Sequence, residues 1–569
     1  MAVRERRAQH GVTMFLQRCG RGLVLLVLLF SGGCAEPPVG PPTEVAIVPH
    51  ISEEVRGKLL EGAITILDRL ENYDEALAVE QVFDRLNQWI HADPVGDAAA
   101  SAEWKEDSLR DSLPEDYQDM CTDEKLGSSV FDPIYDIVAI RDQRWLADIA
   151  KTARGEALDD IDIATSLFRW TIRSLAIQSD PPLLATAGSS GVRWFERGEI
   201  LLSGRGSAAQ RSWIFLELLR QAGLQGVMLA TVDRDGSYRP WLPALISGGE
   251  AYLFEPTYGI PVPSVGAPGV ATVREAAANP AVLTQFDDDS RRYPVASDDM
   301  SSLVVLVVAD PQSLSRRMDL LEQSLFGGSA VRLATDASAL GSFAVAALPQ
   351  GERETPVALW SFPFEVRRRR QAKEMAVNHA LAEELQVMGV VVEEKRKGSG
   401  LSSGRRTIRP LYAGRLREFR GELEGPNGAK KAYLLARPSN AAVADLVARV
   451  PEGQREAVRK VYVQMKEDAT YWLGIVTLSE GDYEIAVDYL GRMTLLAAPD
   501  GRWASAARVN LAEAKIQTGD TQGAIELLRE DRSPQRFGSR FRAQQVAPGS
   551  TPESPTRQPE DETKAGPSE

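Results

Sequence analysis

The chain has few of the residues that build metal sites and disulfide frameworks, with only three cysteines and four histidines among 569 residues. It contains no Cys-x-x-Cys pair, no His-Glu-x-x-His segment and no Walker-type phosphate-binding loop. Two of the cysteines, Cys19 and Cys34, lie in the N-terminal segment, so Cys121 has no other cysteine to pair with in the body of the chain. We therefore expect no metal, no cofactor and no intrachain disulfide.

Long hydrophobic runs are also missing, and the one near the N-terminus, Leu23–Phe30, is too short to cross a bilayer as a helix. Five arginines precede this run, and Ser31-Gly32-Gly33-Cys34 follows it. The basic start and short apolar core predict a signal peptide over residues 1–33. The small residues before Cys34 resemble the lipobox of bacterial lipoproteins, which implies cleavage before Cys34 and its acylation into a membrane anchor. The alternative is a cleaved secretory signal in which Cys34 is incidental.

Positive charge is in deficit, with 65 lysines and arginines against 80 acidic residues and a formal net charge of −15. Removal of residues 1–33 takes away five arginines and one glutamate, which leaves a net charge of −19. An acidic surface disfavours nonspecific binding to nucleic acid, so we expect no nucleic-acid partner. Because Ala35 rather than Asp follows Cys34, analogy with bacterial lipoproteins predicts a periplasmic-facing or outer-membrane position in the cell envelope.

The middle of the chain predicts one buried helix followed by an antiparallel meander. Ser207 is a suitable helix N-cap, the apolar residues from Phe215 to Ala222 follow a helical period, and Gly223 stands where a C-cap glycine belongs. Short apolar runs at 227–231, 241–246 and 251–254 are separated by Asp-Gly and Gly-Gly turns. Upstream, a helix over 160–174 and a short strand at 175–177 are expected.

This order of elements resembles the transglutaminase-like superfamily over roughly residues 130–295. The family pattern Gly-x-Cys, then Leu-Leu-Arg-x-x-Gly, then His-Ala-Trp and Asp-Pro-Thr is matched by Gly206-Ser207-Ala208, Leu218 to Gly223, Arg239-Pro240-Trp241 and Glu255-Pro256-Thr257. The resemblance implies a papain-like α+β core. It also places Ala208, Arg239 and Glu255 at the positions of the catalytic Cys, His and Asp.

The substituted positions predict a domain without its ancestral chemistry. Ala208 carries no nucleophile, and Arg239 stays protonated, so it cannot act as a general base near neutral pH. Arg239 and Glu255 could instead form a structural ion pair across neighbouring strands. Alternatively, Ser207, Arg239 and Trp241 could line the remnant of a cleft and bind a peptide or a carboxylate.

The competing class is an enzyme, a transglutaminase-like hydrolase or acyltransferase with a non-standard nucleophile such as Ser207. It would need a carboxylate or a lysine brought close by the fold to act as base. Cys121 is a weaker candidate nucleophile because the only histidine that follows it, His379, is remote in sequence. We favour a lone buried thiol at Cys121.

On either side of this region the sequence predicts mostly helices. Amphipathic patterns over 52–70 and 74–90 predict a helical hairpin. Residues 303–308, 314–325 and 331–333 predict a β-α-β unit without a nucleotide fingerprint. The basic stretch 367–409 is read as a solvated helix end plus a loop, with an anion site as the alternative.

The C-terminal part resembles tetratricopeptide repeats. Trp472-Leu473-Gly474, Gly481-Asp482-Tyr483 and Ala486 form one repeat, and Gly519-Asp520 with Ala524 recurs 38 residues later. The resemblance implies close helix crossings at the alanines, and a separate helix over 455–465 is expected to cap the stack. Residues from Val546 onward are rich in Pro, Ser and Glu, which predicts a disordered tail.

The predicted fold class is α+β, comprising a helical N-terminal region, a transglutaminase-like core, a small α/β segment and a tetratricopeptide-like hairpin array. The expected boundaries are signal peptide 1–33, Pro-rich tether 34–49, helical region 50–128, transglutaminase-like domain 129–295, α/β segment 296–436, repeats 437–545 and tail 546–569. The predicted function is that of a non-catalytic envelope lipoprotein that binds proteins or peptides and is held at the membrane by its acyl anchor.

Overall fold

The computed structural model describes residues 52–93, 104–179, 195–287, 291–349, 354–371, 385–395 and 405–547. The predicted signal peptide, Cys34, the tether and most of the predicted tail lie outside the described residues. Within the described residues, no helix is both long enough and apolar enough to span a membrane.

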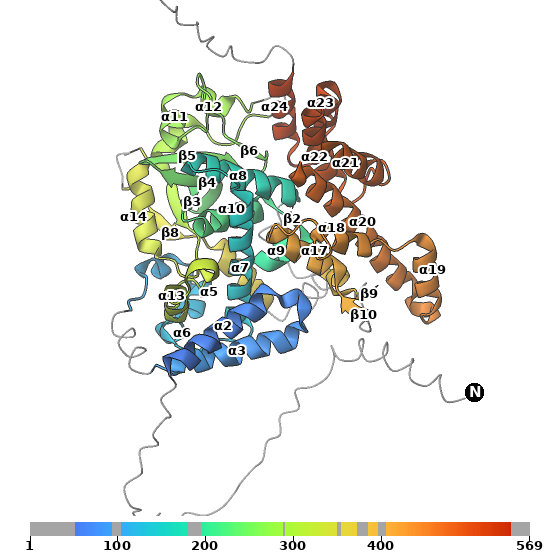
Figure 1. The fold of residues 1–569 in the computed structure, drawn as a ribbon. Helices are drawn as coiled ribbons and strands as arrows, with labels where there is room; N and C mark the ends of the chain where they lie inside the picture. The colour runs from blue at the N-terminus through green and yellow to red at the C-terminus, as the bar shows by residue number, and fades with distance from the viewer. Residues whose placement is uncertain are drawn as a thin grey trace, which may run out of the picture. The chain divides into compact units, whose positions relative to one another are not determined.

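The predicted N-terminal hairpin is confirmed by α2 (Glu53–Asp68) and α3 (Glu75–His91), which pack against each other (Figure 1). Ser52 and Asp74 cap the two helices by accepting hydrogen bonds from backbone N–H groups three residues on. Short helices follow, at η2 (Ser108–Ser112), α5 (Glu115–Gln118), η3 (Asp119–Cys121) and α6 (Asp123–Gly127).

A six-stranded mixed sheet confirms the predicted meander and the mixed helix-and-sheet class. Its strand order is β6-β5-β4-β3-β7-β8. The strands are β3 (Gln225–Val232), β4 (Tyr238–Ser247), β5 (Glu250–Glu255), β6 (Ile260–Pro261), β7 (Val304–Val307) and β8 (Val357–Leu359). Every neighbouring pair is antiparallel except β7 and β8, which are parallel.

Both faces of the sheet are covered, because successive residues of a strand point to opposite faces. Met228, Leu245 and Leu306 belong to the same buried cluster as helix α10 (Ala208–Gln221), which lies against β3 and β4. Their neighbours Val227, Ala244 and Val305 join a second buried cluster with α14 (Ala337–Ala347). This double burial explains the continuous apolar run at β7.

The predicted return strand at Val331–Leu333 is wrong, since these residues form no strand and β8 pairs with β7 instead. Helix α13 (Arg316–Gln323) does form, but its Glu322 carboxylate accepts the backbone N–H groups of Leu333 and Ala334. The Glu322 side chain thus accepts hydrogen bonds that the carbonyl groups of a neighbouring strand would otherwise accept. The apolar side chains of Val331 and Leu333 are buried all the same.

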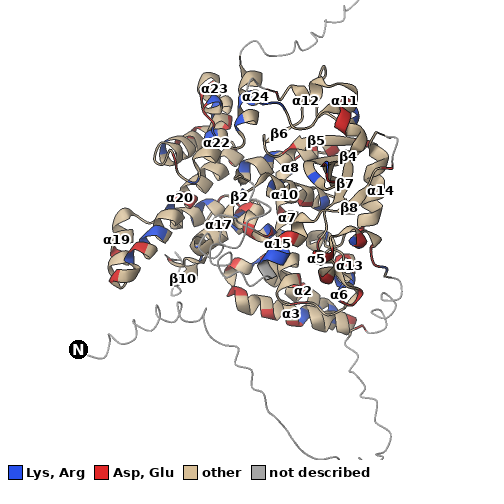
Figure 2. Ribbon diagram, turned by 180° about the vertical axis from the view of Figure 1, so that it is seen from behind, with Lys and Arg blue, Asp and Glu red and all other residues tan. Residues whose placement is uncertain are grey.

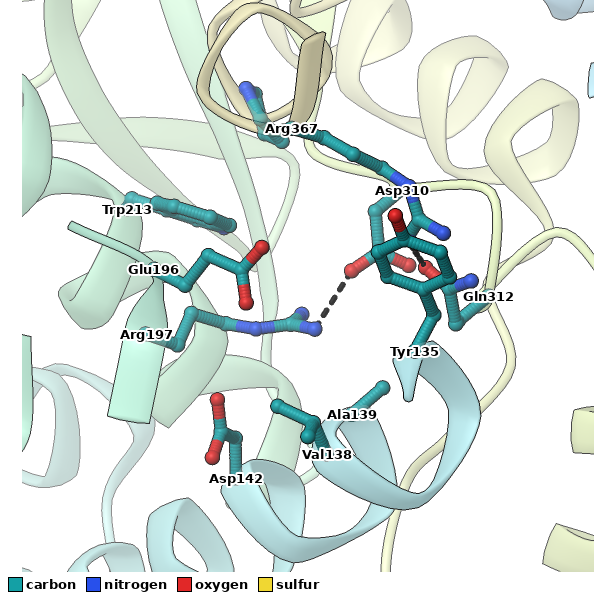
Figure 3. A pocket seen from close by; sticks show the side chains of 11 residues that line it. Tyr135, Val138, Ala139, Asp142, Glu196, Arg197, Trp213, Asp310, Gln312 and Arg367 are labelled. Carbon is teal, nitrogen blue, oxygen red and sulfur yellow. Dashed lines mark hydrogen bonds and ion pairs between the residues drawn. The ribbon is translucent and has the colours of Figure 1, made fainter. Parts of the chain in front are cut away.

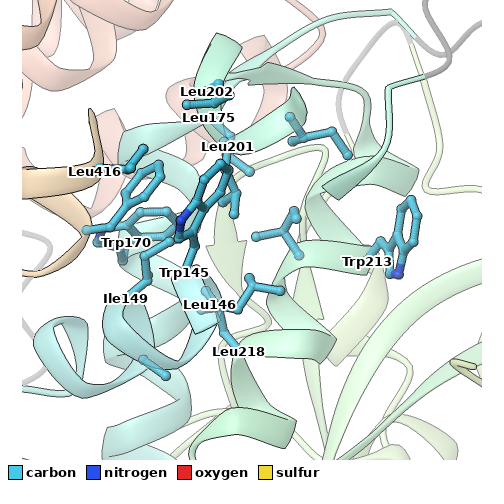
Figure 4. Packing of buried hydrophobic residues seen from close by; sticks show 14 of the residues in the cluster. Trp145, Leu146, Ile149, Trp170, Leu175, Leu201, Leu202, Trp213, Leu218 and Leu416 are labelled. Atoms are coloured by element: carbon cyan, nitrogen blue, oxygen red, sulfur yellow. The ribbon is translucent and has the colours of Figure 1, made fainter. Parts of the chain in front are cut away.

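Helix α10 lies among four other helices, α7 (Tyr135–Ala153), α8 (Asp160–Ser174), α9 (Arg197–Ser203) and α17 (Pro410–Phe419). The predicted helix over 160–174 is confirmed with the same bounds. The predicted strand after it is β1 (Ala176–Ile177), which pairs with β2 (Arg205–Gly206) just before α10. Figure 4 shows the apolar packing between these helices, which joins Trp145 and Ile149 of α7, Trp170 of α8, Leu201 of α9, Leu218 of α10 and Leu416 of α17.

The C-terminal helices form successive hairpins that share a core with the rest of the described chain. They are α18 (Ala429–Leu435), α19 (Asn440–Ala448), α20 (Arg455–Glu480), α21 (Tyr483–Val487), a π-helical turn (Asp488–Leu495), α22 (Ala504–Gln517), α23 (Thr521–Arg529) and α24 (Arg536–Val546). Ala486 and Ala524 are fully buried, which agrees with close helix crossings at these positions. The expected separate cap helix over 455–465 is wrong, because these residues are the first turns of α20.

Helix α20 docks onto the loop before α10 through Trp472. A Cβ atom at Gly204 would lie 2.1 Å from the Trp472 ring, and the φ of Gly204 is +62°, so a side chain there would be both strained and crowded. The guanidinium of Arg415, a residue of α17, lies 3.7 Å from the centre of the Trp472 ring. The C-terminal helices and the sheet region are therefore joined by closely packed side chains at Gly204 and Trp472.

The basic stretch begins in α15 (Phe362–Gln371), where the ribbon in Figure 2 is blue at lysine and arginine positions. Arg367 donates to Gln312 and lies 3.8 Å from the centre of the Tyr135 ring, while Arg368 and Arg369 pair with Glu365. The stretch continues in the antiparallel pair β9 (Val392–Lys395) and β10 (Arg405–Ile408), and residues 396–404 lie outside the described chain. These three arginines are thus engaged within the fold.

The remaining elements are short. They are η1 (Leu70–Asn72), α11 (Val273–Ala278), α12 (Ala281–Thr284), η4 (Ser297–Ser302), η5 (Gly327–Ser329), η6 (Gln386–Gly389) and η7 (Glu452–Gln454).

Candidate functional site

Ser207 and Ala208 stand at the start of α10, where the sequence frame places them. Ser207 is the N-cap and is buried; its Oγ accepts the N–H of Gln210 at 3.3 Å, and its own N–H donates to Gln210 Oε1 at 2.9 Å. This reciprocal pair is a capping box. The Ser207 hydroxyl therefore has a structural task, and no histidine, lysine or carboxylate of the described chain hydrogen-bonds to it.

Glu255 ends β5 and is held by neutral donors. Its Oε2 accepts a hydrogen bond from the Tyr293 hydroxyl at 2.7 Å, and its Oε1 accepts the N–H of Thr257 at 2.8 Å. Trp241 Nε1 donates to the same Tyr293 oxygen at 3.1 Å. Burial raises the pKa of the Glu255 carboxyl above its usual range, although these hydrogen bonds act in the opposite direction.

Arg239 does not pair with Glu255, which corrects the ion-pair interpretation of these two positions. Its Nε lies 3.4 Å from Asp233 Oδ1, and its Nη2 donates to Thr231 Oγ1 at 3.3 Å. The side chain is 50% exposed, so this pair contributes little stability. The register between β3 and β4 shifts by one residue at Met228/Ala230, and beyond this bulge Arg239 is paired with Thr231 of β3.

Arg211, one turn into α10, connects the helix to the chain just beyond Glu255. Its guanidinium donates to Leu175 O at 2.6 and 2.9 Å, to Pro256 O at 2.9 Å and to Gln535 Oε1 at 2.9 Å. Burial among these neutral acceptors lowers the pKa of Arg211 to about 9. The first and fourth segments of the sequence frame are thus neighbours in the fold, joined by an arginine that the frame does not include.

The C-terminal segment, defined here as residues 531–541, covers this junction. Asp531 is buried and accepts hydrogen bonds from Ser533 and Ser539, which fixes the turn before α24. Phe537 lies against Tyr258, with ring centres 5.8 Å apart, and Phe541 lies 5.4 Å from Phe286. The turn that follows Glu255 is therefore packed against protein rather than open to a substrate.

A groove with a volume of about 730 Å³ lies beside this junction, between α8, the β6 turn and helices α20, α21, α22 and α24. None of the predicted groove residues Ser207, Arg239 and Trp241 lines it. Arg169 and Arg173 of α8 do, together with Arg542 of α24. The two arginines of α8 are four residues apart, a spacing that places both on one helix face. That spacing is a signal in the sequence, but the C-terminal helices that complete the groove are remote in the chain.

A second feature missed in the sequence is a buried ion network at the other side of α10. Arg197 of α9 donates to Glu217 of α10 at 2.9 Å and pairs with Asp310 at 2.6 Å. Figure 3 shows the Arg197 side chain reaching Asp310, with Asp142 nearby, around a cavity of about 30 Å³. The cavity is large enough for about one water molecule. This network links α9, α10 and the loop after β7 through buried ion pairs.

Cys121 is buried, as expected of a lone thiol. Burial raises the pKa of the Cys121 thiol to about 12, so it stays protonated and unreactive near neutral pH. Within the described ranges, no group of three or more His, Cys, Asp or Glu side chains is placed to hold a metal ion.

No protein-family model, curated protein or solved structure was found to match this chain. The function has to be argued from its own residues.

Proposed function

We propose that the chain is a non-catalytic lipoprotein of the bacterial cell envelope that binds proteins or peptides. In this proposal a degenerate transglutaminase-like region and tetratricopeptide-like helices form one binding body behind an acyl anchor at Cys34. The observation that carries the non-catalytic part is Ala208 at the start of α10, where the family places its nucleophile. The neighbouring Ser207 is used as a helix cap, and Glu255 is bound to Tyr293.

The binding part of the proposal is supported by the groove between α8 and the C-terminal helices. Its volume of about 730 Å³ is within the range of small-ligand sites, and its lining combines apolar side chains with arginines. It lies between two packed bodies of helices, a common position for binding sites. A pulldown with the acylated protein from detergent-solubilised envelopes should recover specific proteins, and these should be lost when Val509→Trp fills the groove.

The pseudoenzyme claim predicts that the native chain neither hydrolyses nor cross-links peptides. Mass spectrometry of a peptide mixture after incubation would measure both reactions. Ser207→Ala should change nothing in this assay, although loss of the cap should cost about 1 kcal/mol of stability. Ser207→Asp keeps a capping oxygen and serves as the matched control.

Turnover by the native chain that both Ser207→Ala and Ser207→Asp abolish would establish the alternative, a hydrolase or acyltransferase that uses Ser207. Turnover that Ser207→Asp retains would show that the cap, and not a nucleophile, had been disturbed.

The anchor is tested by Cys34→Ser. We expect this variant to move from the membrane fraction to the soluble fraction, because removing the acyl chains removes their hydrophobic attachment. Its thermal unfolding should be unchanged. Retention at the membrane after a high-salt wash would contradict the lipoprotein assignment.

A further inference from the structure

The groove beside α8 has an excess of positive charge in a chain whose net charge is −15. Five charged residues line it: Arg169, Arg173 and Arg542 against Asp162 and Glu513. Arg542 is paired with Glu513. No carboxylate of the described chain forms an ion pair with Arg169 or Arg173, although Glu418 lies near enough to Arg173 to favour its charged form, and both arginines line the groove. A guanidinium group is suited to carboxylates, which its N–H groups can bind through two parallel hydrogen bonds.

Arg173 is held at a fixed place in this groove. Its backbone carbonyl accepts hydrogen bonds from Asn510 Nδ2 at 3.2 Å and from the Tyr471 hydroxyl at 3.5 Å. Its Nε is buried and has no hydrogen-bond partner among the described residues. Burial lowers the pKa of Arg173; the nearby Glu418 carboxylate acts in the opposite direction, and the charge of Arg169 lowers the pKa further. A buried guanidinium N–H without a hydrogen-bond acceptor is costly, and a bound anion would relieve that cost.

The rest of the lining favours a peptide chain over a small inorganic anion. Ile172 of α8, Ile260 and Pro261 of β6 and Val509 of α22 supply an apolar wall. A volume of about 730 Å³ is far more than one carboxylate or phosphate needs. The cationic end and apolar wall together match a short segment of polypeptide with a carboxylate at one end or on one side chain.

We propose that this groove binds a carboxylate-bearing peptide, with Arg169 and Arg173 holding the carboxylate and the apolar wall holding the adjoining residues. This inference rests on the proposed peptide-binding function and names its ligand chemistry. Both arginines come from α8 and Val509 of the apolar wall comes from α22, so α8 and the C-terminal helices would share the recognition.

The test is fluorescence anisotropy with the full chain in detergent and N-terminally labelled random decapeptides in three forms. One form has a free C-terminal carboxylate and no acidic side chains, one is amidated and contains Asp and Glu, and one is amidated and lacks acidic residues. We expect at least one carboxylate-bearing form to bind about tenfold or more tightly than the neutral form. Which of the two binds identifies the source of the carboxylate.

Arg169→Gln and Arg173→Gln should each reduce that binding toward the level of the neutral form. Arg169 is exposed, so its substitution tests the charge without disturbing the core. Arg234→Gln, in the exposed turn between β3 and β4, is the matched control and should bind like the native chain. Arg173→Lys, which keeps the charge but loses the fork, should show an intermediate loss.

Equal binding of all three forms, unaffected by the Arg169 and Arg173 variants but lost in Val509→Trp, would overturn the carboxylate inference and leave the peptide-binding function standing. Absence of binding by every form would overturn both the inference and peptide binding.

Discussion

Glu217→Ala is expected to lower the free energy of unfolding by about 3–5 kcal/mol, because it removes the central acceptor of a buried ion network. The Glu217 side chain is only 4% exposed. It accepts hydrogen bonds from Arg197 at 2.9 Å, Arg220 at 2.6 Å and Gln143 at 3.1 Å. Alanine would leave the buried Arg197 with Asp310 as its remaining ion-pair partner and would leave a void beside α10. Urea unfolding at pH 7 measures the loss.

The same network predicts a pH dependence. Burial alone would raise the pKa of Glu217, but Arg220 and Arg197 outweigh it and the pKa in the folded state is lowered. Burial alone would also raise the pKa of Asp310, but Arg197, the hydrogen bond from the Ser313 backbone and further arginines together outweigh it, and the pKa is lowered. Lowered folded-state values mean that both carboxylates stabilise the fold above the ordinary carboxyl pKa of about 4 and that this contribution is lost as the pH falls through the lowered values.

The difference in unfolding free energy between the native chain and Glu217→Gln should therefore shrink on acidification below pH 4. Glu250→Ala is the control, since Glu250 pairs with Arg274 at the surface and should cost at most about 1 kcal/mol. Similar losses for Glu217→Ala and Glu250→Ala would show that the network contributes no more than a surface pair.

Local sequence signals located most of the elements that carry the site. The amphipathic stripe of α8 and the Ser207 cap of α10 are properties of a few neighbouring residues, and both helices form where the sequence predicts them. The sequence-based predictions are wrong where contacts outside the local pattern decide the backbone conformation or the strand pairing. The backbone at Leu333 is bound by Glu322, and a one-residue bulge changes the pairing of β4 near Arg239.

The candidate site was the hardest part to predict, because its defining contacts join residues far apart in the chain. Arg211 and Gln535 are separated by 324 residues and yet share a buried hydrogen bond. No periodicity of α10 reveals that its first turn will bind a segment just before α24. The sequence frame predicts that Ala208 replaces a nucleophile, whereas only the structure shows the C-terminal segment packed against Arg211 and Tyr258 and the groove beside them.

Gly538→Leu is expected to detach the C-terminal segment from the turn after β5. A Cβ atom at Gly538 would lie 1.9 Å from the backbone oxygen of Tyr258 and 2.6 Å from its carbonyl carbon. Backbone atoms cannot move aside as a flexible side chain can, so α24 must shift. The shift should break the Gln535–Arg211 hydrogen bond and the aromatic contacts of Phe537 and Phe541. We expect a loss of about 2–3 kcal/mol or more.

Hydrogen exchange would locate the effect, with protection lost over residues 531–546 before the sheet is affected. Gly57→Leu is the matched control: Gly57 is also helical, a Cβ there meets no atom within 4 Å, and leucine is the better helix former. Unchanged protection of α24 in Gly538→Leu would mean that the contact with Tyr258 is not as close as the structure has it.

Gly538→Leu also separates two explanations for the expected absence of catalysis. If the ancestral chemistry were merely covered by the C-terminal segment, uncovering it should produce peptide hydrolysis or cross-linking. We expect neither reaction. Ala208 supplies no nucleophile and Arg239 supplies no base, and this holds whether or not the C-terminal segment covers them. Peptide binding should weaken at the same time, since Arg542 and Gln545 of α24 line the groove. A variant that gained turnover while it lost the segment's protection would replace the pseudoenzyme proposal with that of an autoinhibited enzyme.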